Sequence, residues 1–323
     1  MKKQLLIAAV AATMGTAAMA DVSITGDAKF EYFNTETSTV STNKTNTEVN
    51  LGIKGKNGDT TVVANLEFNT HDAASNMDIE DLYMTTKIGD VTVKGGNYAT
   101  GTSAILGEIE NGGRASNKVT LSGSTGGVSW YAGNSAAAGE GSTQLNGNMF
   151  VGGSMDVAGW KVQAKHNSAT VDSFGISGEV SGVGIRLEQK NDTAANGDTT
   201  FGNVTYSTNG IDLAYAWLDS DKANQIDEDD SAIFAVENGI VTATTDTGNA
   251  QITAKTSVAG NTVTVKSGSV ENGIATGTDL DYTQIAVSRP LASGATFAAT
   301  YTDKDDSTST DTQILELDLS VKF

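Results

Sequence analysis

The sequence contains no cysteine, a single proline and only two histidines among its 323 residues. Without cysteine, neither a disulfide framework nor a thiolate metal site can form. His71 and His166 each stand alone in loop-like surroundings, so a metal site with paired histidines is not expected. The chain must instead gain its stability from its size and from main-chain hydrogen bonds that close on themselves.

The signatures of common catalytic and cofactor sites are also missing. No G-x-S-x-G motif lies between a strand and a helix, and the Gly-Gly pairs precede no helix that would receive a phosphate. The acidic run Asp227 to Asp230 lacks the ligand spacing and the glycine of an EF-hand. We therefore expect no enzyme, no cofactor and no metal site.

Long hydrophobic runs are absent except at the N-terminus, and the mean hydropathy is −0.21. There, Lys2 and Lys3 precede an apolar stretch from Leu5 to Val10 and the small residues Ala18-Met19-Ala20. This order is typical of a cleaved export signal, which predicts removal of residues 1–20 and a mature chain of residues 21–323. An uncleaved membrane anchor is the alternative.

The charge is strongly one-sided. Removing Lys2 and Lys3 from the 20 basic residues leaves 18 against 39 acidic ones, a formal charge of −21 for the mature chain. Nucleic acid is not expected as a partner, because binding it requires a basic face. The acidity favours either a role in ion selectivity or simple solubility.

What the chain does contain is strict alternation of apolar and polar residues. In the last segment, five apolar residues alternate with Glu316, Asp318, Ser320 and Lys322 and end on Phe323. The first mature segment alternates in the same way, with Asp27, Lys29 and Glu31 on its polar phase. A period of two predicts β-strands with one apolar and one polar face.

Short and long connections take turns between these strands. Short turns are predicted at Asn57-Gly58-Asp59, Gly89-Asp90, Gly126-Gly127, Ala158-Gly159, Ser181-Gly182, Asn209-Gly210 and residues 292–294. Longer polar segments lie between them, including residues 35–44, 69–78, 100–117, 134–147, 191–199, 220–230 and 303–311. Such sorting is typical of a transmembrane meander whose two rims face different compartments.

The predicted fold class is therefore all-β, a transmembrane antiparallel up-and-down β-barrel. Its strand count depends on residues 231–266, which read as two further hairpins around Asn238-Gly239 and Ala259-Gly260. We expect sixteen strands with part of that segment as a loop, and 18 to 20 strands as the alternative.

Several segments together resemble the general diffusion porins of Gram-negative bacteria. They are Asp21 to Lys29, Leu51 to Gly55, Ile88 to Gly96, and Ser288-Arg289-Pro290-Leu291 followed by Gly294. The resemblance implies an outer-membrane homotrimer for passive diffusion of small hydrophilic solutes, in contact with outer-membrane lipid and lipopolysaccharide. It also implies a third loop, about residues 100–117, folded into the pore, and Phe323 as a signal to the outer-membrane assembly machinery. The chain departs from that family in its third loop, which lacks a Pro-Glu-Phe-Gly-Gly signature.

Pore residues are predicted from the polar phase and from this third loop. A bilayer penalises charges that face lipid, so charged residues on the strands are expected to point inward. We expect Glu108, Glu110, Arg114, Lys29, Lys54 and Lys94 at a constriction, and Glu31, Glu67, Arg186, Glu188 and Glu316 along the pore wall. Opposed charges across water would orient dipolar solutes, with a weak overall preference for cations. Ordinary solvated loop acids are the alternative for Glu108 and Glu110.

Two other functional classes fit an exported β-protein. A barrel enzyme requires a nucleophile, a base and an orienting acid at one rim, which two isolated histidines do not favour. A surface adhesin is expected to show internal repeats or a separate passenger domain, and neither is visible.

Overall fold

The computed structural model describes residues 21–70, 76–98, 115–135, 149–167, 171–192, 197–221, 248–271, 279–306 and 311–323. These residues form eighteen antiparallel strands in one sheet. The first nine are β1 (Asp21–Thr37), β2 (Ser41–Asn57), β3 (Thr60–Asn69), β4 (Asn76–Ile88), β5 (Val91–Tyr98), β6 (Ala115–Thr125), β7 (Val128–Ser135), β8 (Met149–Val157) and β9 (Trp160–Asn167). The others are β10 (Val171–Val180), β11 (Val183–Asp192), β12 (Gly197–Thr208), β13 (Ile211–Ser220), β14 (Gly248–Val258), β15 (Asn261–Glu271), β16 (Leu280–Pro290), β17 (Ala295–Asp306) and β18 (Thr312–Lys322).

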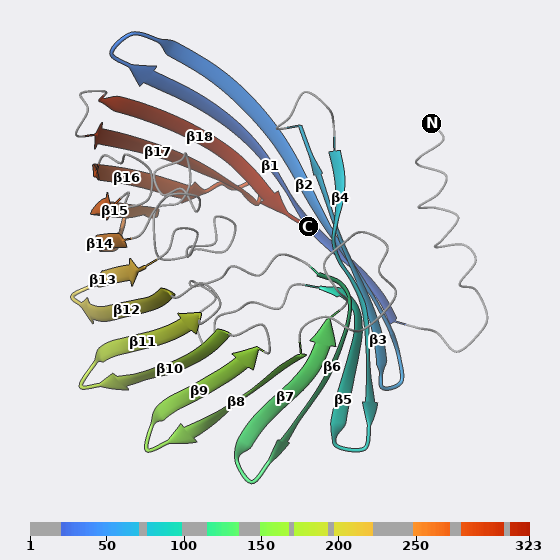
Figure 1. The fold of residues 1–323 in the computed structure, drawn as a ribbon. Coiled ribbons are helices and arrows are strands. Elements are labelled where there is room, and N and C mark those ends of the chain that lie inside the picture. Colours follow the sequence, from blue (N-terminus) through green and yellow to red (C-terminus); the bar gives the residue numbers. More distant parts are fainter. Residues whose placement is uncertain are drawn as a thin grey trace, which may run out of the picture.

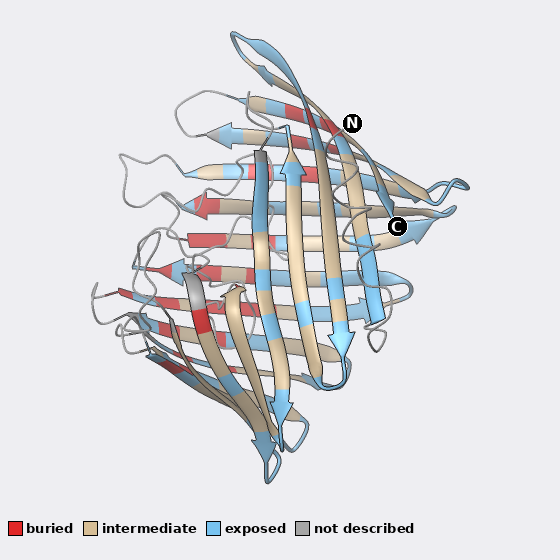
Figure 2. Cartoon of the chain, turned by 90° about the vertical axis from the view of Figure 1, so that its right-hand side faces the viewer, coloured by how far each residue is buried: buried red, intermediate tan, exposed pale blue. Residues whose placement is uncertain are grey.

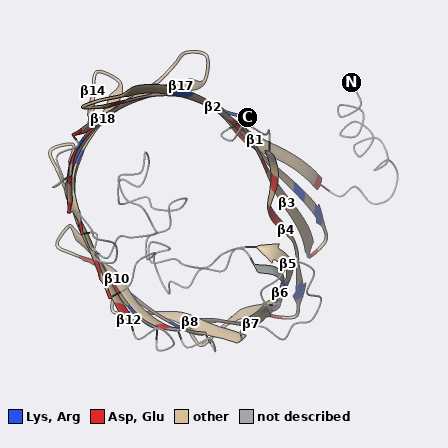
Figure 3. Cartoon of the chain, turned by 45° about the horizontal axis from the view of Figure 1, so that its top comes forward, with Lys and Arg blue, Asp and Glu red and all other residues tan. Residues whose placement is uncertain are grey.

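The sheet closes into a barrel. Each strand pairs with its neighbours in the sequence, and β1 also pairs with β18 from Asp27 opposite Lys322 to Thr37 opposite Thr312. Figures 1 and 3 show the resulting ring. No helix in the described ranges is long and apolar enough to cross a membrane.

The strand count of sixteen is wrong for this chain. The hairpin of β14 and β15 belongs to the wall, where β14 pairs with β13 and β15 pairs with β16. The predicted turn at Ala259-Gly260 connects the two strands, so eighteen strands are reached, as in the alternative. The other predicted hairpin, around Asn238-Gly239, lies outside the described residues.

One predicted long segment, residues 35–44, is mostly strand. β1 runs to Thr37 and β2 begins at Ser41, which leaves a connection of only residues 38–40. The polar side chains pair across the two strands: the Tyr32 hydroxyl donates to Asn43 Oδ1 at 2.9 Å, and Asn34 Nδ2 donates to the same oxygen at 2.8 Å. Polarity suggested a loop, but the alternating threonines favour extended chain.

The predicted short turns are confirmed, and four of them have one backbone geometry. Ala158, Ser181, Asn209 and Ala259 all have φ of 51°, and the glycine after each has φ between 77° and 86°. Positive φ at both central residues defines the two-residue turn that matches the twist of a hairpin. Because a left-handed conformation is unfavourable for a residue with a Cβ, the two alanines are strained.

The two phases of the strands differ as the alternation predicted. Large exposed apolar side chains occur on one phase throughout the wall, as at Phe30, Leu187 and Leu319. The opposite phase carries buried polar groups, and it also carries buried apolar ones such as Phe201, Leu218 and Ile314. Figure 2 shows that the buried residues gather in the strand halves farther from the short turns. The apolar phase faces outward, and the inner wall is polar with apolar patches.

Replacing Ala259 by glycine should stabilise the barrel by about 1 kcal/mol, because glycine carries no penalty for positive φ. The measurement is the free energy of unfolding in urea from lipid vesicles. Gly55→Ala serves as a control, since an added methyl there meets no atom within 4 Å. A loss of stability in Ala259→Gly would contradict this account of the turn.

Candidate channel interior

The structure places the strand residues predicted for the pore on the inner phase. Strand pairing joins Glu31 to Asn46, Lys29 to Glu48, Lys54 to Ser23 and Glu67 to Asn50, all opposite in phase to the exposed apolar residues. Lys94, Arg186, Glu188 and Glu316 lie on the same phase of their own strands. Glu108, Glu110 and Arg114 lie outside the described residues.

Three inward carboxylates meet at the seam between β1 and β18. Oxygens of Glu31, Glu316 and Asp318 lie within 4.8 Å of one another, and Glu31 and Glu316 are almost fully buried. Lys29 Nζ lies 2.7 Å from Glu31 Oε1, and Asn46 Nδ2 donates to Glu31 Oε2 at 2.9 Å. Buried charges require such partners. The cluster has the ligand type for a hard cation, with Lys29 already supplying one positive charge.

A second group of inward acids lies on β2 to β4 and is bound by asparagine amides. Nδ2 of Asn50 donates to Glu48 at 2.7 Å, Nδ2 of Asn69 to Glu67 at 2.6 Å and Nδ2 of Asn65 to Asp81 at 2.8 Å. An amide donor orients a carboxylate without cancelling its charge. We call Glu48, Glu67, Asp78 and Asp81 the acidic wall.

Lys94 is held between two aromatic rings. Its Nζ lies 3.7 Å from the ring centroid of Tyr83 and 3.8 Å from that of Tyr98, and these rings meet edge to face. Lys118 Nζ donates to the carbonyl of Tyr98 at 2.6 Å, and the Tyr98 hydroxyl bonds Thr120 Oγ1 at 2.6 Å. Cation–π contacts attract the ammonium to the two ring faces and fix its position.

An irregularity in the pairing of β5 lies at this lysine site. The pairing with β6 shifts between Gly96 and Tyr98, and Tyr98 lies on the same inward phase of β5 as Lys94 and Gly96. Gly96 has φ of 138°, and a side chain there would collide with the backbone of Leu82 and Tyr83. β5 ends at Tyr98 and β6 begins at Ala115, so the site lies at the base of the predicted third loop.

Basic residues gather on the inner phase of β9 and β11. Lys161 and Arg186 both lie opposite Ser177 of β10, and Lys165 and Lys190 both lie opposite Ser173. Lys161 and Arg186 are exposed, whereas Lys165 and Lys190 are buried. Glu188 is the acid between these rows. We call the four cations the basic group, and it is separated from the acidic wall by β5 to β8.

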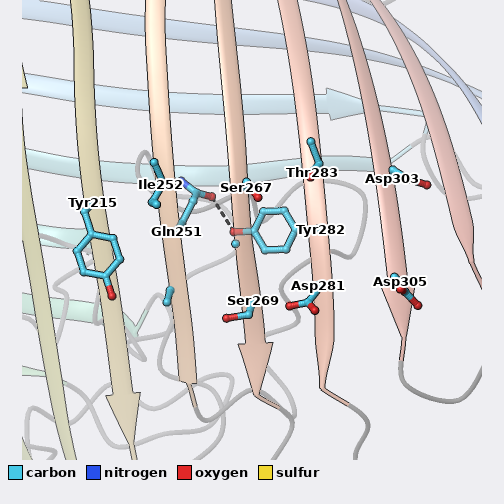
Figure 4. A pocket seen from close by; sticks show the side chains of 12 residues that line it. Tyr215, Gln251, Ile252, Ser267, Ser269, Asp281, Tyr282, Thr283, Asp303 and Asp305 are labelled. Carbon is cyan, nitrogen blue, oxygen red and sulfur yellow. Dashed lines mark hydrogen bonds between the residues drawn. The ribbon is translucent and has the colours of Figure 1, made fainter.

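The inner phase of β14 to β17 carries Lys255, Lys266 and Lys304, and the outward phase is acidic near the ends of β16 and β17. On the inner phase, the Tyr282 hydroxyl donates to Gln251 Oε1 at 2.8 Å across β15 (Figure 4). Tyr282 is inward and buried, and Gly268 between the two side chains leaves room for its ring. Asp281, Asp303 and Asp305 lie on the opposite, outward phase near the ends of β16 and β17 (Figure 4).

The predicted cationic constriction is not one cluster. Lys29 is paired with Glu31, and Lys94 of β5 is enclosed by tyrosines. Lys54 is exposed near a short turn of β2, and β3 and β4 separate it from Lys94. Sequence reasoning missed Lys118, Tyr83 and Tyr98 because they become neighbours of Lys94 through the pairing of β5 with β4 and β6 around Gly96. Strand phase alone would have found Lys190.

Comparison with known proteins gives fold matches only. No known family profile matches the sequence, and no curated protein matches it. Among solved structures, Pseudomonas aeruginosa OccK2 (OpdF) is similar with a TM-score of 0.68, 10% identity, and coverage of 94% of this chain and 98% of that one. The outer membrane protein OpdK of the same organism gives 0.68, 12%, 94% and 98%.

OccK11 (OpdR), also from Pseudomonas aeruginosa, matches with a TM-score of 0.66 and 13% identity over 94% of this chain and 96% of that one. The chain has the barrel fold of these outer-membrane proteins. The sequence resemblance pointed to the general diffusion subtype, whereas these structures are OccK proteins and do not support that subtype.

Replacing Lys94 by methionine should shift ion selectivity toward cations and destabilise the barrel by about 1 kcal/mol, because a cation–π pair is lost. Lys94→Arg should preserve both properties. Reversal potentials in a salt gradient and urea unfolding measure the two effects. A methionine variant with unchanged selectivity would place Lys94 outside the conducting path.

Proposed function

We propose that this protein is an outer-membrane porin, an integral channel for passive diffusion of small hydrophilic solutes and ions. The observation that carries the proposal is a closed eighteen-strand barrel with an apolar outer phase and charged residues inside. A barrel of this strand number encloses space for water. The shared fold with OpdK supports the membrane assignment.

Three finer predictions from the sequence belong to this proposal. We propose that residues 100–117 fold inward, that Phe323 is read by the assembly machinery, and that three copies form the working unit in contact with lipopolysaccharide. The position of Tyr98 and Ala115 at the two ends of this loop, beside Lys94 and Lys118, supports a role in narrowing the pore.

Purified folded protein should produce ohmic conductance steps in a planar lipid bilayer, grouped in threes if the trimer is correct. The formal charge of −21, from 18 basic and 39 acidic residues in the mature chain, favours cations weakly in a salt gradient. Folded barrels without any conductance would reject the porin and favour an adhesin, and a preference for anions would reject the selectivity.

Removing charge from the acidic wall and from the basic group should shift the ion selectivity of the pore in opposite directions. Glu67→Gln with Asp78→Asn should shift the reversal potential toward anions, because it removes two inward negative charges. Lys161→Gln with Arg186→Gln should shift it toward cations. Equal reversal potentials in both double variants would show that these walls do not line the ion path.

A second candidate is selective passage of carboxylate solutes along the basic group. Structures similar to this one were solved with carboxylates, OccK2 with glucuronate and OpdK with vanillate. The exposed Lys161 and Arg186 offer two cations at one level of the wall, which suits a carboxylate.

Glucuronate added to one side of the bilayer should reduce the single-channel current in a concentration-dependent way. The Lys161→Gln and Arg186→Gln double variant should lose this block, whereas the Glu67→Gln variant should retain it. Equal block in both variants would remove the basic group as the binding site.

A further inference from the structure

The last residue of the chain lies on the first strand. Gly26 N–H donates to the carbonyl of Phe323 at 2.8 Å, and Phe323 N–H donates to the carbonyl of Gly26 at 2.9 Å. These two bonds extend the pairing of β1 with β18 by one residue beyond Asp27 and Lys322. The backbone of Phe323 therefore completes the seam independently of its side chain.

The side chain of Phe323 needs a glycine beneath it. A methyl group on Gly26 would lie 2.9 and 3.0 Å from Cζ and Cε2 of the phenylalanine ring, and it would also collide with the carbonyl of Asn50. The ring thus covers the bare backbone of Gly26 on the outward phase. It remains 61% exposed, so most of its surface is still open to lipid.

Glycine paired with an aromatic ring recurs throughout the wall. In six cross-strand pairs, an added methyl on the glycine would collide with the ring opposite: Gly123 with Trp130, Gly133 with Phe150, Gly152 with Tyr131, Gly178 with Trp160, Gly202 with Trp217 and Gly268 with Tyr282. All three tryptophans of the chain take part. A ring over a glycine restores the contacts that the missing side chain would have made.

Gly26 and Phe323 differ from those six pairs in what they join. The six connect strands that follow each other in the sequence, so short connections or a single loop bring their partners together. Gly26 and Phe323 join the first and last strands, which meet only when the whole barrel closes. Their contact therefore forms in the step that removes the last two open sheet edges.

We propose that the Phe323 ring packs on Gly26, which we call its seat. We propose further that this contact, which we call the latch, promotes closure of the barrel between β1 and β18. The proposal rests on the assembly role proposed above for Phe323 and deepens it: the aromatic ring is accessible while the seam is open and becomes fixed on β1 when the seam closes. Gly26 acts as a positioning residue, since it fixes the ring without contacting any solute.

A disulfide across the seam reports closure directly. Ala28 and Val321 are cross-strand partners on the outward phase, and the natural chain has no cysteine. The mature chain with Ala28→Cys and Val321→Cys is folded from urea into phosphatidylcholine vesicles, and the rate of disulfide formation is followed. Adding Phe323→Ala should slow that rate by about threefold to fivefold, the loss expected for one aromatic cross-strand pair.

The matched control places the two cysteines at Ala254 and Val265, which pair across the adjacent strands β14 and β15. Disulfide formation there should not respond to Phe323→Ala. An unchanged rate at the seam, or equal slowing at both positions, would overturn the latch.

The role of Gly26 as the seat is tested by asking whether the slowing of closure by Phe323→Ala depends on Gly26. In a Gly26→Ala background the ring is already displaced, so Phe323→Ala should slow closure by less than half as much as it does with Gly26. In a Gly202→Ala background the full effect should remain, because that glycine supports Trp217 instead. An effect of Phe323→Ala that is the same with Gly26 in place and in the Gly26→Ala background would overturn the seat.

If Gly26→Ala does not fold, the seam disulfide with Gly26 in place still decides the latch. The porin proposal is separable from this result. Folded protein that closes as expected but conducts no current would reject the porin and leave the latch standing. Conducting channels in which Phe323→Ala does not slow disulfide formation at the seam would reject the latch and leave the porin standing.

Discussion

Closure of the hydrogen-bond ladder is the constraint on which the rest of the structure depends. Hydrocarbon offers no partner for a main-chain N–H or C=O group, so a sheet in a bilayer must leave no open edge. The pairing of β1 with β18 meets this requirement from Asp27 to Thr37, and the two bonds between Gly26 and Phe323 extend it to the last residue. A chain without cysteine has no covalent substitute for that seam.

In the proposed porin, once the ladder is closed, alternation directs each strand side chain either to lipid or to the lumen. Charged side chains therefore gather on the inner phase. There, each one requires a partner that holds the side chain in place without cancelling its charge. Asparagine amides do this for the acidic wall, and two tyrosine rings do it for Lys94. The acidic wall and the basic group lie on separate strands, which produces a field across the lumen rather than a uniform one.

The sequence was sufficient for the fold class, the short turns and the inward phase of the predicted strand residues, because each depends on a period of two or on a local turn. The strand count of sixteen was wrong because it took part of the polar segment 231–266 as a loop, whereas β14 and β15 pair with β13 and β16 in the wall. Residues 35–44 were misread for the same reason. A strand of this kind is recognised only by its partners.

The lysine site at the base of the third loop shows a different limit. Lys94 was identified from its phase, but its two tyrosines and Lys118 meet through the pairing of β4, β5 and β6 around Gly96. The buried, inward position of Tyr282 also depends on a partner strand, because Gly268 of β15 makes room for its ring. Such contacts depend on register between strands, which no single segment encodes.

The central claim is that one phase of the strands lines water and the other faces lipid. Single cysteines placed in turn along β11, from Gly184 to Gln189, test it directly with a charged, membrane-impermeant thiol reagent during conductance recording. Modification and a drop in current are predicted at Gly184, Arg186 and Glu188 and not at Ile185, Leu187 and Gln189. Reaction without alternation, or at the odd positions alone, would contradict the account.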